Sequence, residues 1–272
     1  MPFSKNGSPI MTALLASRNW FLACRPRTLV AGASPVLVGM CLAPHSLGAL
    51  ALLFALLVQV GTNFANDFYD FGKGADRNRV GPARAVASGW IAPEAMQRAA
   101  FGVLGAAALV AVPLLAHVGW HLWPLGAAAI ALALLYTAGP FPLAYVGLGE
   151  LPCLLFFGPL ACAGTALIGL GYWSHEALIY GLGPGFIAVA LMVANNLRDE
   201  ETDRAAGKKT LVVRFGRKFG LLEWGLCVAG AALVAPPLAS LTCLLARPTL
   251  QATARTHLAY TCALCLSLLL WH

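Results

Sequence analysis

Residues 47–70 read LGALALLFALLVQVGTNFANDFYD, an apolar run that ends in amides and carboxylates. Residues 47–66 contain no charged side chain, and a helix of about 20 apolar residues is long enough to cross the hydrocarbon core of a bilayer. Asp67 and Asp70 follow directly. Carboxylates are costly near hydrocarbon, so their position at the edge of a span indicates a functional site.

The whole chain has the composition of a membrane protein. It is 59% hydrophobic and 11% charged, whereas soluble domains average about 25% charged residues. We therefore predict an all-α fold, a polytopic transmembrane helical bundle that forms one domain over residues 1–272. The expected spans lie near residues 21–42, 47–66, 96–116, 121–138, 150–171, 177–197, 219–246 and 254–271.

The stretch 219–246 is too long for one span and short for two. Pro236 and Pro237 interrupt it, and proline breaks a helix because it lacks an N–H donor and clashes with the preceding turn. Arg247 and Arg255 would be cytoplasmic if the stretch crosses twice, so we favour a tight hairpin and a bundle of about nine helices around a central cavity. A single crossing, with eight spans, is the alternative.

The charges predict which side of the membrane each loop occupies. The N-terminal segment and the two polar loops at 67–94 and 198–218 hold 15 of the 18 Lys and Arg residues. Such loops face the cytoplasm under the positive-inside rule. We therefore expect a multi-pass protein of the inner (plasma) membrane whose partner is the lipid bilayer. The net charge of +7 then does not indicate nucleic acid.

All five aspartates lie in two clusters, at 67–76 and 199–203. Residues three or four apart share one face of a helix. Asn66 and Asp70 would form one such stripe. The second stripe has the same spacing and comprises Asn195, Asn196, Asp199 and Asp203. Two facing stripes of oxygen donors suit Mg²⁺, which prefers a few carboxylates together with substrate phosphates.

Cations flank both clusters and suit a diphosphate, since a leaving group of this kind needs positive charge where its negative charge accumulates. Helix orientation is the alternative role for each of them. The flanking cations are Lys73, Arg77, Arg79, Arg84, Arg198, Arg204, Lys208, Lys209 and Arg214.

An ordered set of motifs runs through most of the chain. The motifs are residues 25–29 (RPRTL), 66–70 (NDFYD), 73–76 (KGAD), 79–89 (RVGPARAVASG), 136–140 (YTAGP), 142–150 (PLAYVGLGE), 196–199 (NLRD) and 207–214 (GKKTLVVR). The set resembles the UbiA-type superfamily of intramembrane aromatic prenyltransferases, and within it the 1,4-dihydroxy-2-naphthoate polyprenyltransferase branch.

This resemblance implies helices around a central cavity and two bound Mg²⁺ ions. Asn66 and Asp70, with Asp76 nearby, would hold one ion, and Asp199 and Asp203 the other. Asn195 or Asn196 would assist the second ion, and Asp67 would orient or deprotonate the acceptor hydroxyl. The catalytic set is thus Asp67, Asp70, Asp199 and Asp203. The candidates for diphosphate contact are Arg25, Lys73, Arg84, Arg198 and Lys208.

The implied reaction moves a polyprenyl group from polyprenyl diphosphate to an aromatic acid, followed by loss of CO₂ to give demethylmenaquinone. An apolar cavity would protect the allylic cation from water, and aromatic faces would stabilise it. We expect Tyr136 and Tyr145 to face the acceptor or prenyl chain. Other candidate wall residues are Phe64, Phe68, Tyr69, Phe156 and Phe157.

Several alternatives stay open from the residues alone. The acceptor could be 4-hydroxybenzoate or homogentisate. A CDP-alcohol phosphotransferase also uses aspartates and Mg²⁺, but its aspartates lie in one region. A transporter would place its carboxylates inside spans rather than at their ends. Prenyl chain length and oligomeric state are not predicted.

Overall fold

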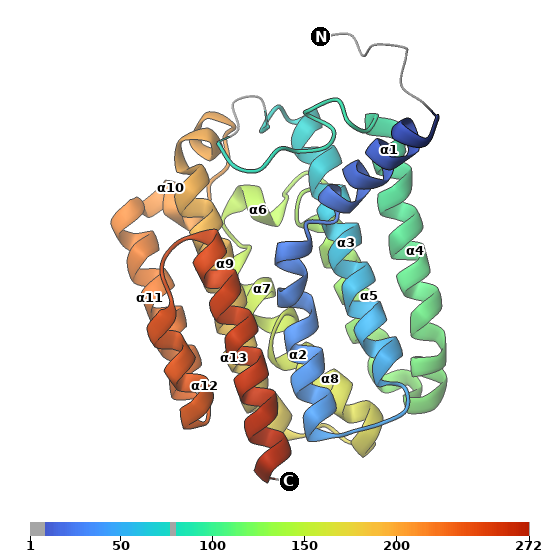
Figure 1. Ribbon diagram of the computed structural model, residues 1–272, viewed down its shortest axis with the longest axis vertical. Coiled ribbons are helices and arrows are strands. Elements are labelled where there is room, and N and C mark those ends of the chain that lie inside the picture. Colours follow the sequence, from blue (N-terminus) through green and yellow to red (C-terminus); the bar gives the residue numbers. More distant parts are fainter. Residues whose placement is uncertain (1–8, 77–79, 272) are drawn as a thin grey trace.

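The computed structural model describes residues 9–76 and 80–271, and within them every regular element is helical (Figure 1). The α-helices are α1 (Pro9–Ala23), α2 (Leu29–Leu42), α3 (Gly48–Gly72), α4 (Pro93–Val118), α5 (Trp123–Leu135), α6 (Leu143–Val146), α7 (Glu150–Phe156), α8 (Pro159–Leu170), α9 (His175–Ala205), α10 (Leu211–Phe215), α11 (Arg217–Leu233), α12 (Pro237–Thr242) and α13 (Leu250–Trp271). Three 3₁₀ turns are η1 (Pro26–Thr28), η2 (Gly119–Leu122) and η3 (Cys243–Leu245).

The fold is a bundle of roughly parallel and antiparallel helices with the short helices α6 and α7 at its centre (Figure 1). Four helical stretches in the described part are long and apolar enough to span a membrane: Gly48–Gly72, Pro93–Leu135, Glu150–Leu170 and His175–Ala205. Large apolar side chains also face outward, with Leu109 73% and Leu233 85% exposed. The chain is therefore a multi-pass membrane protein.

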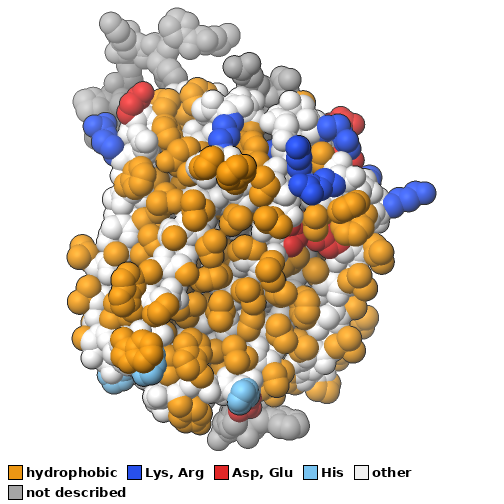
Figure 2. All heavy atoms as spheres, turned by 180° about the vertical axis from the view of Figure 1, so that it is seen from behind, with side chains coloured by type: hydrophobic (Ala, Val, Ile, Leu, Met, Phe, Trp, Pro, Cys, Tyr) orange, Lys and Arg blue, Asp and Glu red, His pale blue; other side chains and the backbone are white. Residues whose placement is uncertain are grey.

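Charge separates along the bundle on the face that Figure 2 shows. Lys and Arg side chains gather towards one end, His side chains lie at the other, and apolar side chains cover the surface between them. This distribution is the one that the positive-inside rule predicts for a bundle crossing a membrane.

The two helices that carry the aspartates are longer than the sequence pattern predicts. The polar loops were expected to begin at residues 67 and 198, but α3 runs to Gly72 and α9 to Ala205. Asn66 and Asp70 are therefore one helical turn apart, as are Asn195 and Asp199. The shared-face prediction is confirmed for the helix, and the predicted loop boundaries are wrong.

The span expected at 150–171 is broken into α7 and α8 at Gly158. The break fits against two glycines of α9: a Cβ on Gly181 would lie 2.6 Å from the Cα of Pro159, and one on Gly185 would lie 3.0 Å from the Cα of Gly158. Small residues let helix backbones approach closely in membranes. This crossing holds α7 beside the centre of the bundle.

The stretch 219–246 is divided where its prolines predicted. Helix α11 ends at Leu233, and α12 begins at Pro237. The return limb is only six helical residues followed by η3. The count of about nine full crossings stays a prediction. Helix α1, which precedes the first expected span, was not predicted.

Candidate active site

The acidic ends of α3 and α9 lie together at one end of the bundle. Lys208 joins them, because its Nζ lies 3.4 Å from Oδ2 of Asp70 and 3.6 Å from Oδ1 of Asp203. Both carboxylates are buried, with Asp70 2% and Asp203 8% exposed. The structure thus brings the two predicted clusters into one site.

The turn after α9 places Lys208 there. Gly207 has a φ of 73°, a left-handed conformation that glycine adopts at helix C-termini. The backbone N–H of Lys208 donates to the carbonyl of Asp203 at 2.9 Å. The chain therefore reverses at once, and the lysine side chain returns over the helix end.

Arg84 adds a second cation to the site. Its guanidinium lies 3.7 Å from Oδ2 of Asp70 and 3.5 Å from Oδ1 of Asp76. The residue is 8% exposed, and its Nη1 has no hydrogen-bond partner within the described residues. A buried guanidinium N–H without an acceptor is costly, so this group is suited to an anionic ligand. Arg77 and Arg79 lie outside the described residues.

Hydrogen bonds and one cation–π contact connect Tyr145, Lys73 and Thr137 to the end of α3. The Tyr145 hydroxyl donates to Oδ1 of Asp70 at 2.9 Å, and its ring lies 4.4 Å from the Nζ of Lys73. That Nζ donates to the Thr137 carbonyl at 2.6 Å, and the Thr137 hydroxyl donates to Oδ1 of Asn66 at 2.9 Å. These contacts fix the orientation of both predicted metal ligands on α3.

The same surroundings shift the pKa of two groups. Burial, followed by the negative charge of Asp70, raises the pKa of the Tyr145 phenol, so this hydroxyl stays a hydrogen-bond donor. Desolvation lowers the pKa of the Lys73 ammonium; Asp70 opposes this effect and Lys208 adds to it.

Asp67 lies apart from the cavity. Its carboxylate accepts the backbone N–H groups of Ala85 at 3.0 Å and Val86 at 3.3 Å, and it is 1% exposed. It therefore anchors the segment that carries Arg84. This placement does not fit the expected contact with an acceptor hydroxyl.

Arg198 turns towards its own helix. Its guanidinium makes two bonds to the Asp199 carboxylate, at 2.7 and 2.5 Å, and one to Oδ1 of Asn195 at 2.6 Å. Gly81 leaves room for this guanidinium, since a Cβ there would lie 2.6 Å from Nη2. Arg198 thus pairs with one carboxylate and one amide of the second predicted metal stripe.

Arg25 reaches the site from the turn between α1 and α2. It has a φ of 53°, the one positive value at a non-glycine residue in the described part. Its Nη2 donates to the Asn63 carbonyl at 3.4 Å, while Nδ2 of Asn63 donates to the Cys24 carbonyl at 2.9 Å. Arg25 and α3 are therefore tied together beside the cavity.

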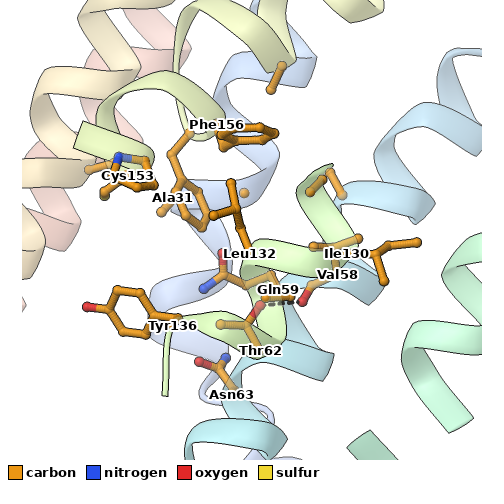
Figure 3. Close-up of a pocket in the computed structure, with 18 of the residues that line it drawn as sticks. Ala31, Val58, Gln59, Thr62, Asn63, Ile130, Leu132, Tyr136, Cys153 and Phe156 are labelled. Atoms are coloured by element: carbon orange, nitrogen blue, oxygen red, sulfur yellow. Dashed lines mark hydrogen bonds between the residues drawn. The ribbon is translucent and has the colours of Figure 1, made fainter. Parts of the chain in front are cut away.

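These groups close one end of a cavity of about 450 Å³. The predicted site residues that line it are Arg25, Asn66, Asp70, Arg84, Tyr136, Asn195, Asn196, Asp199, Asp203 and Lys208. The remaining wall is mostly apolar and reaches Leu122, Trp123 and Ile168 far from the aspartates. Figure 3 shows its middle part, where Ala31, Leu132 and Phe156 face one another across the space.

The aromatic predictions divide into two groups. Tyr136, Phe156 and Phe157 line the cavity. Phe64, Phe68 and Tyr69 instead pack under α1 and α4 in the cluster around Met96, so their predicted place on the wall is wrong. Tyr145 lies at the polar end against Asp70.

Some lining residues were not predicted. Gln59 lies on α3 seven residues before Asn66, and Glu150 begins α7. A signal for Gln59 exists in the sequence, because it is the first strongly polar residue of the run 47–66 and shares the face of Asn66 and Asp70.

The donor set fits a hard divalent cation. It offers carboxylate and amide oxygens with neither thiol nor imidazole among them, as Mg²⁺ prefers. The described residues hold no group of three or more His, Cys, Asp or Glu side chains arranged for a metal. Mg²⁺ keeps several waters and takes phosphate oxygens from a bound ligand, so it needs few protein oxygens.

Comparison with known proteins gives the family. The model of the UbiA prenyltransferase family matches residues 33–272. This chain belongs to the UbiA prenyltransferase family. The chain is therefore a transferase, and the family resemblance of its motifs is confirmed.

Curated relatives within the UbiA family share one name. The 1,4-dihydroxy-2-naphthoate octaprenyltransferase of Mycobacterium tuberculosis is 38% identical, over 78% of this chain and 75% of its own length. The protein of the same name from Escherichia coli is 36% identical, over 72% of this chain and 68% of its own.

Solved UbiA structures have the same fold. A UbiA homolog from Archaeoglobus fulgidus bound to GPP and Mg²⁺ superposes with a TM-score of 0.64 at 19% identity, covering 90% of this chain and 84% of that one. The form of that homolog bound to DMAPP and Mg²⁺ gives a TM-score of 0.63, covering 92% of this chain and 86% of that one.

Proposed function

We propose that this protein transfers a polyprenyl group from a polyprenyl diphosphate to 1,4-dihydroxy-2-naphthoate, with loss of CO₂ to give demethylmenaquinol, the reduced form of demethylmenaquinone. The observation that carries the proposal is the Lys208 ammonium, which joins Asp70 and Asp203 at the polar end of an apolar cavity. Two relatives named for this naphthoate acceptor, from Mycobacterium tuberculosis and Escherichia coli, support the choice of acceptor.

The donor diphosphate would bind at that polar end. Arg84 offers a buried N–H without a partner in the described part of the chain, and Lys208 offers an ammonium. Arg25 lines the same end. The Nζ of Lys73 lies over the ring of Tyr145. Lys73 would therefore act on the diphosphate through its charge at a distance, or directly after rotation of its side chain. Fixed cations here stabilise the negative charge that develops as the allylic C–O bond breaks.

Mg²⁺ is the proposed cofactor. Asn66 and Asp70 would hold one ion, with Asp76 nearby, and Asp199 and Asp203 would hold another with Asn195 or Asn196. Bound Mg²⁺ would neutralise the diphosphate and help it to leave. Two structural neighbours bound to Mg²⁺ together with a short prenyl diphosphate support this assignment. Arg198 would have to release Asp199 when the ion binds, since it now occupies both carboxylate oxygens.

The cavity wall protects the reacting carbon. Water is excluded by the apolar residues below Asn66, and Tyr136, Phe156 and Phe157 present aromatic faces to the prenyl group. The allylic C–O bond breaks and a C–C bond to the electron-rich ring forms. The ring carboxylate then leaves as CO₂, and its electron pair returns to the ring. Diphosphate carries away the negative charge. The product keeps both ring hydroxyls and so stays at the quinol level of the acceptor, and the reaction therefore needs no oxidant or reductant.

We place the protein in the inner (plasma) membrane with this site on the cytoplasmic side. The end of the bundle that carries the aspartates also carries the Lys and Arg side chains in Figure 2, as cytoplasmic ends do.

A transfer assay tests the function. Membranes containing the protein are supplied with a radiolabelled prenyl diphosphate and, separately, 1,4-dihydroxy-2-naphthoate, 4-hydroxybenzoate or homogentisate, with Mg²⁺ or with EDTA. We expect a prenylated, decarboxylated product from the naphthoate when Mg²⁺ is present, and no product when EDTA replaces Mg²⁺. Product from 4-hydroxybenzoate or homogentisate in place of the naphthoate would overturn the acceptor assignment.

A further inference from the structure

Gln59 is a buried amide in the middle of a membrane-spanning helix. It is 8% exposed, and its Oε1 has no hydrogen-bond partner in the described part of the chain. A buried polar atom without a hydrogen-bond partner is destabilising, and the cost rises where no water can reach it. A leucine or methionine would fill the same space without this cost, so the amide is suited to a ligand.

The amide faces the cavity and has room to do so. Gln59 lines the wall, and Figure 3 shows its side-chain amide between Leu132 and Asn63. The facing position on α2 is Gly32, where a Cβ would lie 3.3 Å from the Gln59 Oε1 and 3.4 Å from its Cβ. The bare glycine therefore leaves the space that the amide occupies.

Gln59 lies below the diphosphate site. It is seven residues from Asn66 and eleven from Asp70 on one helix, which is about 10 and 16 Å at 1.5 Å per residue. Tyr136 and Asn63 lie on its polar side in Figure 3, and Phe156 lies on its apolar side. The amide thus marks the boundary between the polar end of the cavity and its apolar depth.

Only one part of the substrates can satisfy an amide at this depth. The diphosphate belongs to the cations around Asp70 and Lys208, and the prenyl chain is hydrocarbon without donor or acceptor atoms. An aromatic acceptor carries hydroxyl and carboxylate oxygens. The Gln59 amide offers one acceptor oxygen and two N–H donors, which suits a hydroxyl or a carboxylate.

We infer that Gln59 is a specificity-determining residue that binds an oxygen substituent of the aromatic acceptor. The inference rests on the proposed transfer to an aromatic acceptor. Gln59 holds the oxygen-bearing edge of the ring, and the ring lies between Gln59 and the allylic carbon at the polar end. The acceptor is thereby oriented by a hydrogen bond that the prenyl chain cannot make.

Gln59→Leu tests the inference, and Gln59→Asn shortens the amide by one methylene while keeping its donors and acceptor. We expect Gln59→Leu to raise the acceptor KM about tenfold or more, as loss of a buried hydrogen bond to substrate does, with the donor KM unchanged. Gln59→Asn should lie between this variant and the wild type. The matched control is Thr62→Val, because the Thr62 hydroxyl lines the same cavity but already donates to the Val58 carbonyl at 2.8 Å.

Acceptor analogues separate binding from a general packing effect. Inhibition constants are measured for three analogues: 1-hydroxy-2-naphthoate, which lacks the 4-hydroxyl, 4-hydroxy-2-naphthoate, which lacks the 1-hydroxyl, and 1,4-naphthalenediol, which lacks the carboxylate. One of the three lacks the oxygen that Gln59 binds, and it should bind the wild type and Gln59→Leu equally well. Weakening of all three analogues and of the full acceptor by the same factor would overturn the inference.

The two proposals fail in different ways. If the wild type prenylates 1,4-dihydroxy-2-naphthoate and the Gln59 variants keep the wild-type acceptor KM, the inference about Gln59 is wrong and the proposed function stands. If the wild type instead uses 4-hydroxybenzoate or homogentisate, the naphthoate assignment is wrong. The role of Gln59 is then decided by measuring the KM of that acceptor for the wild type, Gln59→Leu and Gln59→Asn.

Discussion

Lys208 and Asp70 are 138 residues apart in sequence, yet the lysine Nζ lies 3.4 Å from the aspartate Oδ2. The same ammonium lies 3.6 Å from Asp203, so one side chain holds the tips of α3 and α9 together. A half-buried cation between two carboxylates is poised to exchange one of them for a phosphate oxygen, because carboxylate and phosphate oxygens are both hard anionic partners.

Lys208→Met should therefore impair donor use. We expect a lower kcat and a higher KM for the prenyl diphosphate, with a combined loss in kcat/KM of about 10²–10³, comparable to the loss of one donor to a developing anion. The measurement is initial rate against donor concentration at saturating acceptor. Lys209→Met is the matched control, because that neighbouring lysine is exposed. Equal losses in the two variants would point to overall charge rather than to this contact.

Asp70→Asn and Asp203→Asn should raise the Mg²⁺ concentration needed for half-maximal rate and lower the rate by about 100-fold or more, because each removes a charged oxygen ligand. Titration of the rate with MgCl₂ measures both effects. Glu201→Gln removes an exposed carboxylate of α9 and should titrate like the wild type. An unchanged Mg²⁺ requirement in both aspartate variants would contradict the metal assignment.

The two oxygen-rich stripes could be predicted because they depend on local geometry alone: a long apolar run, then polar residues at helical spacing. The contact that Lys208 makes between the two stripes could not be predicted from the sequence. It depends on the turn at Gly207, which brings Lys208 back over the end of α9. The role of Asp67 was missed for a similar reason. Its partners are two backbone N–H groups about 18 residues away, and backbone groups leave no sequence signal.

The break at Gly158 was also hidden. Hydropathy is the same whether an apolar run is one helix or two, so residues 150–171 look like one span. The position of the break is decided by the close approach of Gly181 and Gly185 on α9 to Gly158. This is a contact between separate parts of the chain.

Asp67→Asn should loosen the segment that carries Arg84 without removing a catalytic base. The variant weakens the acceptor for the N–H groups of Ala85 and Val86. We expect faster hydrogen exchange at these two amides and a modest rise in donor KM through Arg84. The pH–rate profile should keep its shape. Loss of the acidic limb of that profile, with normal exchange at both amides, would restore Asp67 as the acceptor base.

Donor binding should weaken at high pH. The pKa of Lys73 is lowered by desolvation, with Lys208 contributing and Asp70 opposing. A lowered pKa means that the positive charge is lost on raising the pH sooner than for an ordinary lysine, whose pKa is about 10.4. We expect the donor KM to rise along this alkaline limb.

Lys73→Arg should move that limb to higher pH, because arginine keeps its proton to about pH 12 or above. Donor KM is measured at steps between neutral and strongly alkaline pH. Lys218→Arg, at an exposed position, should leave the limb in place. A limb that stays fixed in Lys73→Arg would assign the titration to another group.

Gly185→Ala should lower thermal stability through the α7–α8 break. A Cβ at Gly185 would lie 2.6 Å from the Leu154 carbonyl oxygen and 3.0 Å from the Cα of Gly158, and overpacking of this kind costs about 1–3 kcal/mol. Because α7 carries Cys153 and Phe156 on the cavity wall, the displaced helix should also raise the acceptor KM. Gly225→Ala is the control: it is helical with nothing within 4 Å of a Cβ, so it should keep or raise the melting temperature by its better helix propensity. Thermal unfolding in detergent compares the melting temperatures of the two variants. If Gly185→Ala were as stable as Gly225→Ala, the contact between α9 and the α7–α8 break would have space for a methyl group, and the prediction would be wrong.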